Sequence, residues 1–343
     1  MDTPYDAAKP LAHLGGRLAT GLLETSDDLG VLDGSGRWAV VVTYEGAVTC
    51  ARFADWPTAP LPDAPAWRGP GRDAWTSSLD RTSYVAAAEE IRRRIAAGTV
   101  YQANLCRVLS ARLRGGPDLL PLTRTLAERH DARYAGVVRL PEAGVYVASA
   151  SPELYLRRRG DHVASAPIKG TGRSADDLSE KDVAENIMIV DLVRNDLSRV
   201  CATGTVAVEG LLSTQAYPGL VHLVSTVTGR LEPGRGWRDL VEATFPPGSV
   251  TGAPKSTAVT TIADLEPVPR GPYCGAVGWV DADTGEGELA VGIRTFWADE
   301  GWLRFGTGAG ITWGSDPGKE WTETELKAGR LIGLASADAE GGR

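Results

Sequence analysis

The sequence has few of the features that mark membrane proteins and nucleic-acid-binding proteins. No apolar run approaches the length needed to span a bilayer, and the first residues have neither the basic region nor the apolar core of a secretory signal. The net charge is −8, and no basic stripe is interleaved with aromatic residues. We therefore expect a cytoplasmic protein that binds neither membrane nor nucleic acid, and that needs local cations wherever it holds an anionic substrate.

Cysteine is also scarce. The four cysteines, Cys50, Cys106, Cys201 and Cys274, are scattered and form no C-x-x-C pair. This spacing is not that of a thiolate metal site or of a disulfide framework. We expect four reduced thiols in the core of the protein.

The 343 residues, of which 43% are hydrophobic and 23% charged, are enough to bury a large core. Strand patterns joined by short turns mix with helices and do not follow the alternation of a parallel βαβ sheet. Strands are predicted within the first 50 residues and at 101–110, 134–140, 145–149, 154–158, 276–281, 288–297 and 302–305. Helices are predicted at 181–197, 237–244, 256–265 and 317–334. The class is α+β, with large antiparallel sheets and helices outside.

A proline-rich connector from Trp56 to about Arg72 is the clearest linker. It suggests a β-rich N-terminal segment, residues 1–72, that belongs to the same compact domain as a catalytic region at 73–343. A helix follows the connector, with Ser83 as its predicted N-cap and Gly98 at its end.

One lysine, Lys169, stands in the stretch A-P-I-K-G-T at 166–171, which is predicted to be a tight turn with apolar flanks. Desolvation favours the neutral form of a lysine amine, which is then a nucleophile at neutral pH. A loop lysine in water is the simpler interpretation, because lysine is rarely buried without a partner. Nearby acidic pairs, glycine-rich turns and the Ser-Pro-Glu turn at 151–153 favour the interpretation of Lys169 as a nucleophile.

Two acidic pairs lie three residues apart on predicted helices, Asp182 with Glu185 and Glu320 with Glu323. Such pairs are common on solvated helix faces. The first helix, however, is apolar on most sides and is predicted to be buried, and buried carboxylates need partners. Two pairs on two helices therefore favour Mg²⁺, which takes few carboxylates and keeps other oxygens in its shell.

The glycine-rich stretches are predicted to be turns without a nucleotide. Residues 248–256 resemble a P-loop, but Pro254 stands where glycine must precede the lysine. Residues 306–310 are G-x-G-x-G, outside any parallel βαβ unit. Both turns can still present N–H groups to a carboxylate. Arg294, at the end of an apolar strand, is either a carboxylate clamp or an ordinary strand-end arginine.

The ordered motifs between about Ser83 and Leu334 resemble those of the chorismate-utilising enzymes. They are Y-Q-A-N-L at 101–105, S-P-E at 151–153, P-I-K-G-T at 167–171, A-E-N-I-M-I-V-D-L-V-R-N-D at 184–196, H-L-V-S at 222–225, G-S-V-T-G-A-P-K at 248–255, Y-C-G-A-V-G-W at 273–279, I-R-T at 293–295, G-A-G-I at 308–311 and E-W-T-E-T at 320–324. The lysine of P-I-K-G-T looks like aminodeoxychorismate synthase component I, because anthranilate synthases usually have alanine there. The resemblance implies an anthranilate synthase component I-like fold.

The resemblance also implies a mechanism. Mg²⁺ would be held by Glu185 and Glu323, with Asp182 and Glu320 acting directly or through water. Glu153 would protonate the departing C4 hydroxyl of chorismate, and Lys169 would attack C2 to give a covalent adduct. Ammonia would then add at C4 and expel the lysine.

The resemblance implies a set of substrate-binding residues, which are Gln102, Thr171, His222, Thr251, Lys255, Tyr273, Arg294, Gly308, Ala309, Gly310 and Lys327. Family members that add water have a lysine base where this chain has Gln102, so hydroxylation to isochorismate is disfavoured. The histidines and cysteines form no amidotransferase module, so ammonia is expected from free ammonium or from a separate glutamine amidotransferase subunit. Anthranilate or aminodeoxyisochorismate formation and a non-enzymatic binding role remain as alternatives.

Overall fold

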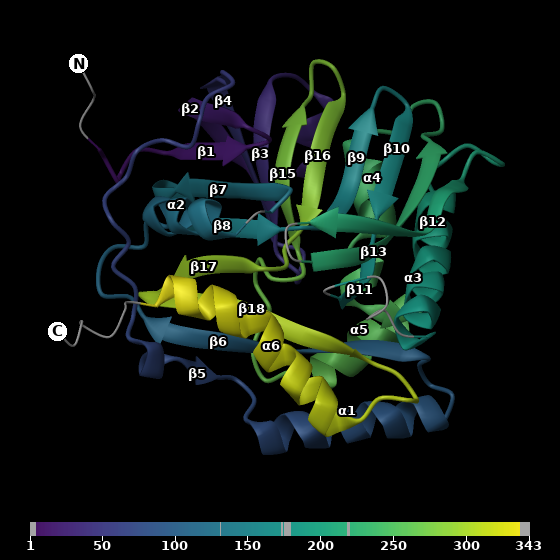
Figure 1. The fold of residues 1–343 in the computed structure, drawn as a ribbon. Helices are drawn as coiled ribbons and strands as arrows, with labels where there is room; N and C mark the ends of the chain where they lie inside the picture. The colour runs from purple at the N-terminus through teal and green to yellow at the C-terminus, as the bar shows by residue number, and fades with distance from the viewer. Residues whose placement is uncertain (1–4, 131, 173, 175–179, 218–219, 337–343) are drawn as a thin grey trace.

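Two antiparallel sheets that share strand β2 form the body of the computed structural model, which describes residues 5–130, 132–172, 174, 180–217 and 220–336 (Figure 1). The first sheet contains, in spatial order, β2 (Arg17–Ser26), β1 (Leu11–Leu14), β7 (Tyr134–Leu140), β8 (Val145–Ser151), β17 (Thr295–Asp299), β18 (Trp302–Ile311) and β6 (Gln102–Arg112), with β5 (Thr76–Ser77) and β14 (Gly252–Ala253) against β6. The second sheet contains β2, β4 (Val48–Asp55), β3 (Arg37–Val42), β15 (Ala276–Asp281), β16 (Glu286–Val291), β9 (Leu154–Arg159), β10 (His162–Ala166), β13 (Leu220–Arg230) and β12 (Ala207–Tyr217), and β11 (Ile168–Gly172) also pairs with β13.

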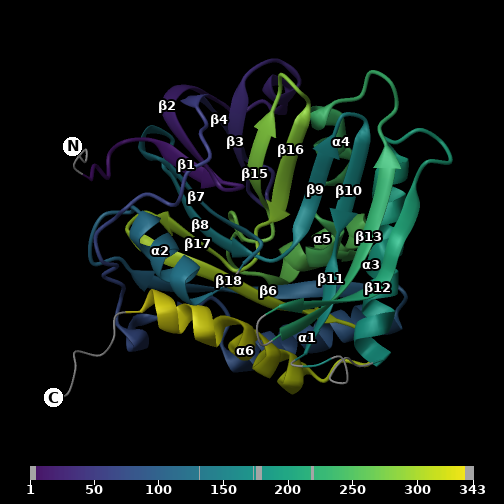
Figure 2. The ribbon, with the colours of Figure 1, turned by 45° about the horizontal axis from the view of Figure 1, so that its top comes forward.

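The helices lie on the outer faces of these sheets (Figure 2). They are α1 (Arg81–Ala96), α2 (Leu120–Arg129), α3 (Glu180–Ser198), α4 (Trp237–Thr244), α5 (Lys255–Leu265) and α6 (Pro317–Ala335). Helices α2 and α6 share a buried cluster with β17 and β18, in which Leu122 and Leu331 join Phe296 and Phe305. The predicted class, α+β with two large antiparallel sheets and helices outside, is confirmed.

The main core includes residues of both sheets, such as Val108 and Val138 of the first and Leu156 and Val277 of the second. All four cysteines are buried and free, as the sequence predicted. None of the helices in the described ranges combines the length and the apolar character that a bilayer crossing requires.

The N-terminal segment is part of both sheets, because β1 pairs with β7 and β3 pairs with β15. Residues 56–71, where the linker was predicted, contain no helix and no named strand. Helix α1 begins one turn earlier than predicted. Its N-cap is Asp80, whose Oδ1 accepts a hydrogen bond from the Ser83 N–H at 2.7 Å, so Ser83 is the partner of the cap. The helix ends at Ala96, and Gly98, which was predicted to close it, follows the C-cap Ala97 with φ +74°.

The strand predicted at 288–297 is interrupted. It forms β16 and β17, which belong to different sheets, with Gly292 to Arg294 between them. Arg294 has φ +52°, a left-handed conformation that is unfavourable for a side chain of this size. Backbone strain of this kind is not visible in a pattern of apolar residues.

The glycine run 306–310 is the second half of β18, and the prediction of a turn there is wrong. Glycine is required because neighbouring groups press on the strand. An added Cβ would lie 2.0 Å from the Tyr273 ring at Gly306 and 2.6 Å from Cys106 Sγ at Gly308. The close approach of side chains, rather than a change of direction, explains this glycine run.

Candidate active site

Two crossovers between the sheets lie side by side and carry Glu153 and Arg294. The chain passes from β8 to β9 at Glu153, and from β16 to β17 at Arg294. The Val291 N–H donates to the Glu153 carbonyl at 3.0 Å, and the Ala150 N–H donates to the Arg294 carbonyl at 3.0 Å. Glu153 and Arg294 therefore occupy the same junction of the two sheets.

Glu153 is a buried carboxyl whose pKa is raised to about 7. Burial is the main cause, because desolvation disfavours the charged form. Ser249 Oγ and the Ile168 N–H donate hydrogen bonds to the carboxylate and oppose the rise. The positive charges of Lys169 and Arg294 act in the same direction. A carboxyl that titrates near neutrality suits a general acid.

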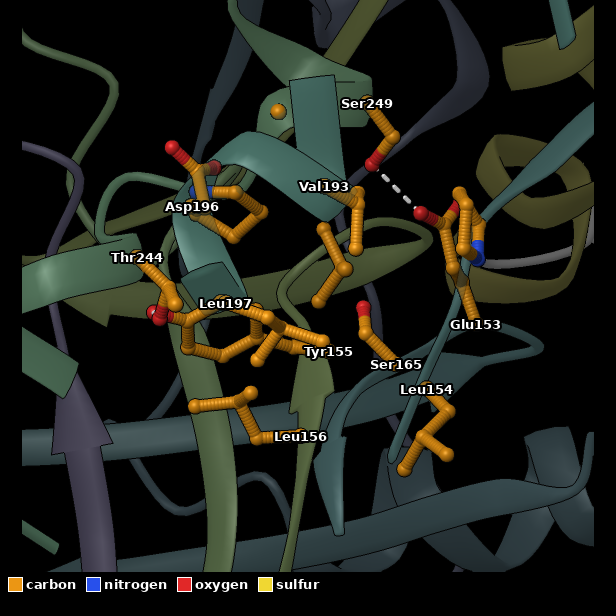
Figure 3. A pocket seen from close by; sticks show the side chains of 14 residues that line it. Glu153, Leu154, Tyr155, Leu156, Ser165, Val193, Asp196, Leu197, Thr244 and Ser249 are labelled. Carbon is orange, nitrogen blue, oxygen red and sulfur yellow. Dashed lines mark hydrogen bonds between the residues drawn. The ribbon is translucent and has the colours of Figure 1, made fainter. Parts of the chain in front are cut away.

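A small cavity lies behind Glu153 (Figure 3). Its volume is about 10 Å³, which is room for about one water. Asp196 and Thr244 line its far side, as Figure 3 shows. Burial raises the pKa of Asp196 to about 6, although Lys255 Nζ donates to its Oδ2 at 2.6 Å. The cavity is too small for an organic substrate, so the substrate must meet Glu153 from another side.

Lys169 lies on strand β11, so the predicted turn is wrong here as well. The pairing of β11 with β13 shifts register on either side of Lys169 and Gly170, which marks a bulge, and Gly170 has φ +86°. Bulges re-aim side chains. The charge of Lys169 favours the ionised forms of three carboxyls, those of Glu153, Glu185 and Glu323. The lysine therefore lies within electrostatic reach of both the buried acid and the carboxylates of α3 and α6.

The carboxylates of α3 and α6 meet around a lysine that the sequence reasoning did not select. Lys181 Nζ donates to Glu320 Oε1 at 2.5 Å and lies 3.6 Å from Glu185 Oε1. Lys327 Nζ lies 2.6 Å from Glu323 Oε1. Asp182, the fourth predicted metal ligand, is half-buried on α3.

The pKa values of these carboxyls differ in direction. Burial raises the pKa of Glu185, and the charges of Glu323 and Glu320 add to the rise while Lys169 and Lys181 oppose it. Burial acts in the same sense on Glu323, but the neighbouring lysines, led by Lys327, outweigh it and lower its pKa. Within the described ranges, no group of three or more His, Cys, Asp or Glu side chains is already arranged to hold a metal ion.

Gln102 is buried at the start of β6 and faces the same cluster. An added Cβ at Gly310 would lie 2.5 Å from Gln102 Nε2 and 3.4 Å from Glu185 Oε2. Glycine at 310 therefore makes room for these two side chains. Gln102 Oε1 is buried and has no hydrogen-bond partner among the described residues, so it is an acceptor in need of a donor.

The amides predicted to bind a carboxylate divide into two kinds. On β6, the N–H groups of Cys106 and Asn104 donate away from β18. Gly308 and Gly310 lie directly opposite Cys106 and Asn104 on β18. In an antiparallel pair, opposite residues either exchange hydrogen bonds with each other or both point their N–H groups away. The N–H groups of Gly308 and Gly310 therefore point to the edge of β18 that faces away from β6. Ala309 lies between them, and its N–H faces β6. Only the two glycines can offer amides to a ligand.

The edge of β18 beside Gly308 is next to α6. Lys327 Nζ donates to the Gly308 carbonyl at 3.1 Å, which joins the glycine edge to the carboxylate cluster. His222, on β13, is buried, and its pKa is lowered to about 4 by burial first and by the charge of Arg294 second. The imidazole is therefore neutral at pH 7.

The remaining predicted binding residues are engaged in the scaffold. Thr251 Oγ1 donates to the Pro247 carbonyl at 3.1 Å. Lys255 Nζ also donates to the Thr244 carbonyl at 2.6 Å, behind the small cavity. Tyr273 is 5% exposed and packs in the main core. Thr171 lies on β11, and its side chain is outside the described part of the structure.

Sequence reasoning missed two residues of this site. Ser249 lies in the quoted glycine-rich motif, but nothing in the motif shows that its hydroxyl reaches Glu153. Lys181 left a clearer signal, because it precedes Glu185 by four residues and so shares its helix face.

Residues 45–333 match the family model described as chorismate binding enzyme. The chain belongs to this family. Among its relatives, anthranilate synthase component 1 of Thermus thermophilus is 39% identical over 285 residues, which are 80% of this chain and 61% of that protein. Aminodeoxychorismate synthase component 1 of Klebsiella aerogenes is 34% identical over 346 residues, which are 96% of this chain and 75% of that protein.

A solved structure from Bacillus anthracis, described as a 2,3-dihydroxybenzoate-specific isochorismate synthase, superposes with a TM-score of 0.80 at 26% identity. The match covers 96% of this chain and 97% of that one. The chain spans less than two thirds of the Thermus relative's length. Family and fold are thus established, while the relatives carry the names of different reactions.

Proposed function

We propose that the chain aminates chorismate with ammonia to give 4-amino-4-deoxychorismate. The observation that carries the proposal is that Lys169 follows Ile168, whose N–H donates to the Glu153 carboxylate, and that the lysine charge acts on Glu185 and Glu323 as well. An amine close to both a general acid and a group of carboxylates suits a substitution in which the leaving group needs a proton.

In the first half of the proposed reaction, the amine of Lys169 forms a bond to C2 of chorismate. Both ring double bonds shift, from C1=C2 and C5=C6 to C1=C6 and C4=C5, and the bond from C4 to its hydroxyl breaks. Glu153, protonated in part near pH 7, gives its proton to that hydroxyl, which leaves as water. The lysine nitrogen loses a proton to water, so the products are a secondary amine adduct and a carboxylate at Glu153.

In the second half, ammonia forms a bond to C4 while both double bonds return to C1=C2 and C5=C6, and the C2–nitrogen bond of Lys169 breaks. The departing lysine nitrogen takes up a proton from water, and the ammonium group at C4 gives one to the Glu153 carboxylate. Overall, chorismate and ammonia give 4-amino-4-deoxychorismate and water. The covalent adduct divides one difficult substitution into two steps.

Anion binding in this proposal relies on groups from both sheets. The guanidinium of Arg294 is suited to a carboxylate, and the N–H groups of Gly308 and Gly310 lie on an edge of β18 where no described strand pairs.

Mg²⁺ fits the oxygen-only donor set of Glu185, Glu320 and Glu323, since Glu320 Oε2 is buried and has no partner among the described residues. When bound, the ion would offset the charge of a substrate carboxylate.

Gln102 favours amination of chorismate over the addition of water. Its amide side chain is buried beside Gly310 and Glu185 and has no basic nitrogen, so it cannot deprotonate water. Ammonia needs no such base, because it is a nucleophile in its neutral form. This supports amination over the reaction named for the Bacillus structure.

Ammonia is proposed to come from a separate glutamine amidotransferase subunit, with free ammonium as a substitute in vitro. The two relatives quoted above are both named as component 1 of their synthases, which is in keeping with a second component. Anthranilate formation is the competing function, because one of those relatives is an anthranilate synthase.

The proposal is tested by incubating the purified chain with chorismate, Mg²⁺ and ammonium, and by measuring chorismate loss and pyruvate release together. Loss of chorismate that depends on ammonium and releases no pyruvate is expected. Pyruvate in equal amount would indicate anthranilate instead, and loss of chorismate without ammonium would indicate water addition.

Ser249 provides a prediction about pH. Its hydroxyl favours the ionised form of Glu153, so Ser249→Ala is expected to raise the pKa of Glu153 and move the alkaline decline of kcat/KM up by about one pH unit. Rates are expressed per concentration of NH₃, so that ammonium titration does not distort the profile. Ser165→Ala, which alters the same cavity, is the matched control. A decline that stays in place or moves down contradicts the role assigned to Ser249.

A further inference from the structure

Lys181 is the one basic side chain found to bridge the acidic residues of α3 and α6 in the described part of the chain. It lies in the first turn of α3, and its ammonium contacts Glu320 on α6 and Glu185 one turn along its own helix. The two carboxylate side chains are 4% and 11% exposed, whereas that of Lys181 is 39% exposed. The anions are therefore fixed in the protein, while the cation reaches them from the solvent side.

The Lys181 ammonium offsets the mutual repulsion of the carboxylates of α3 and α6. Glu320 and Glu323 both disfavour the ionised form of Glu185, and burial does so too. Removing one partner from such a cluster leaves buried charge unpaired, which is costly. The ammonium of Lys181 thus supplies the positive charge that lets the carboxylates approach each other.

The balance is incomplete, however. Lys181 uses Oε1 of Glu320, but Oε2 of the same carboxylate is buried without a hydrogen-bond partner in the described ranges. A single ammonium cannot satisfy the oxygens of several carboxylates at once, whereas a divalent cation takes six or more oxygen ligands. The unpaired Glu320 Oε2 therefore favours a ligand with a higher positive charge than the lysine ammonium.

We propose that the Lys181 ammonium is a resident substitute for the divalent cation, and that the cation must displace it from Glu320 and Glu185 in order to bind. The proposal rests on the metal part of the proposed function. A divalent ion and an ammonium on the same carboxylate oxygens repel each other, and the lysine has a flexible stem and a route to water. Lys181 thereby holds the site together without metal and competes with metal for it.

The first test needs no variant. The chain is treated with a reductive methylation reagent with and without saturating Mg²⁺, and the methylation rate of each lysine is followed by peptide mass spectrometry. Methylation of Lys181 is expected to become several-fold faster with Mg²⁺, because its ammonium is released to water. Lys319, an exposed lysine next to Glu320, is the internal control and should not change. An unchanged or slower rate at Lys181 overturns the proposal.

The second test measures affinity. Binding of Mn²⁺, used as a spin probe in the absence of chorismate, is followed by the loss of its free EPR signal. Lys181→Met is expected to bind Mn²⁺ about 10-fold more tightly, since no charged hydrogen bond has to be broken, and Lys319→Met should match the parent protein. The metal-free Lys181→Met protein should also unfold at lower temperature and regain stability with Mn²⁺.

Weaker binding by Lys181→Met, or binding equal to that of Lys319→Met, overturns the proposal, and so does a parent protein that binds no Mn²⁺. Neither test measures turnover. Failure of this proposal about Lys181 is therefore distinguishable from failure of the proposed amination, because the amination assay depends on Glu153 and Lys169 as well.

Discussion

Replacing Glu153 with glutamine is expected to lower chorismate turnover by about 10²–10⁴-fold, the usual contribution of a general acid. The amide keeps the shape of the side chain and still accepts a hydrogen bond from Ser249 Oγ. It has no proton to give at the pKa of about 7 that the carboxyl has in the folded chain. Loss of rate with little change in KM, measured in the amination assay, would mark an interaction made in the transition state.

The same substitution is expected to stabilise the fold at alkaline pH. The pKa of Glu153 is raised to about 7 in the folded chain from a reference value of 4.5, so between these pH values the folded state binds more protons than the unfolded state. Stability from this group is fully present below pH 4.5 and is lost as the pH rises through 7. Glutamine removes that loss, which amounts to about 3 kcal/mol at pH 8 as an order of magnitude.

The measurement is the free energy of unfolding in urea at pH 5 and pH 8. Glu153→Gln should gain over the parent protein at pH 8 and much less at pH 5. Glu128→Gln, on the exposed face of α2, is the matched control, and its free energy of unfolding should differ from that of the parent protein by the same amount at both pH values. A variant that is destabilised equally at both pH values would show that the carboxylate is held by favourable contacts and is not strained by burial.

Replacing Lys169 with alanine is expected to abolish covalent adduct formation and to slow amination by about 10²–10³-fold. Amination should not vanish, because Glu153 remains to protonate the leaving hydroxyl and ammonia can still attack. Lys169→Arg separates charge from nucleophilicity. It keeps the positive charge that acts on Glu153 and Glu185, but its guanidinium stays protonated and cannot attack carbon.

The adduct is sought by intact-protein mass spectrometry after incubation with chorismate and Mg²⁺ without ammonium. The parent chain should gain the mass of chorismate less one water, and peptide mapping should place that mass on Lys169. Both variants should gain nothing. An adduct in either variant, or full amination by Lys169→Ala, would remove Lys169 from its assigned role.

Much of the fold follows from local patterns. Strands β7 and β15 and helix α4 have the predicted bounds, because the strands are short apolar runs and the helix has an apolar face, each bounded by turn residues. Helix α2 and strands β10, β12 and β13 were not predicted. β12 and β13 have glycine, serine and threonine among their apolar residues and show no strict alternation. Their pairing is a property of the sheet and not of the local sequence.

Motifs in the sequence nominate the residues of the candidate site but do not give their arrangement. Ordered motifs identify Glu153, Lys169 and the acidic pairs in the sequence. That Glu153 and Arg294 meet depends on two crossovers between sheets, one of them with a left-handed arginine, and no spacing rule conveys this. The Gly308 N–H points away from β6 because its opposite residue, Cys106, donates its own N–H to Glu266 and not to β18.

The most direct test of the account locates the new nitrogen on the product. The chain is supplied with chorismate, Mg²⁺ and ¹⁵N-ammonium, and the product is examined by ¹H–¹⁵N correlation NMR without purification. The account predicts that nitrogen is bonded to C4 of a ring that keeps its enolpyruvyl group. Nitrogen bonded to C2, with or without loss of pyruvate, would contradict the assignment of C2 to Lys169 and of C4 to ammonia.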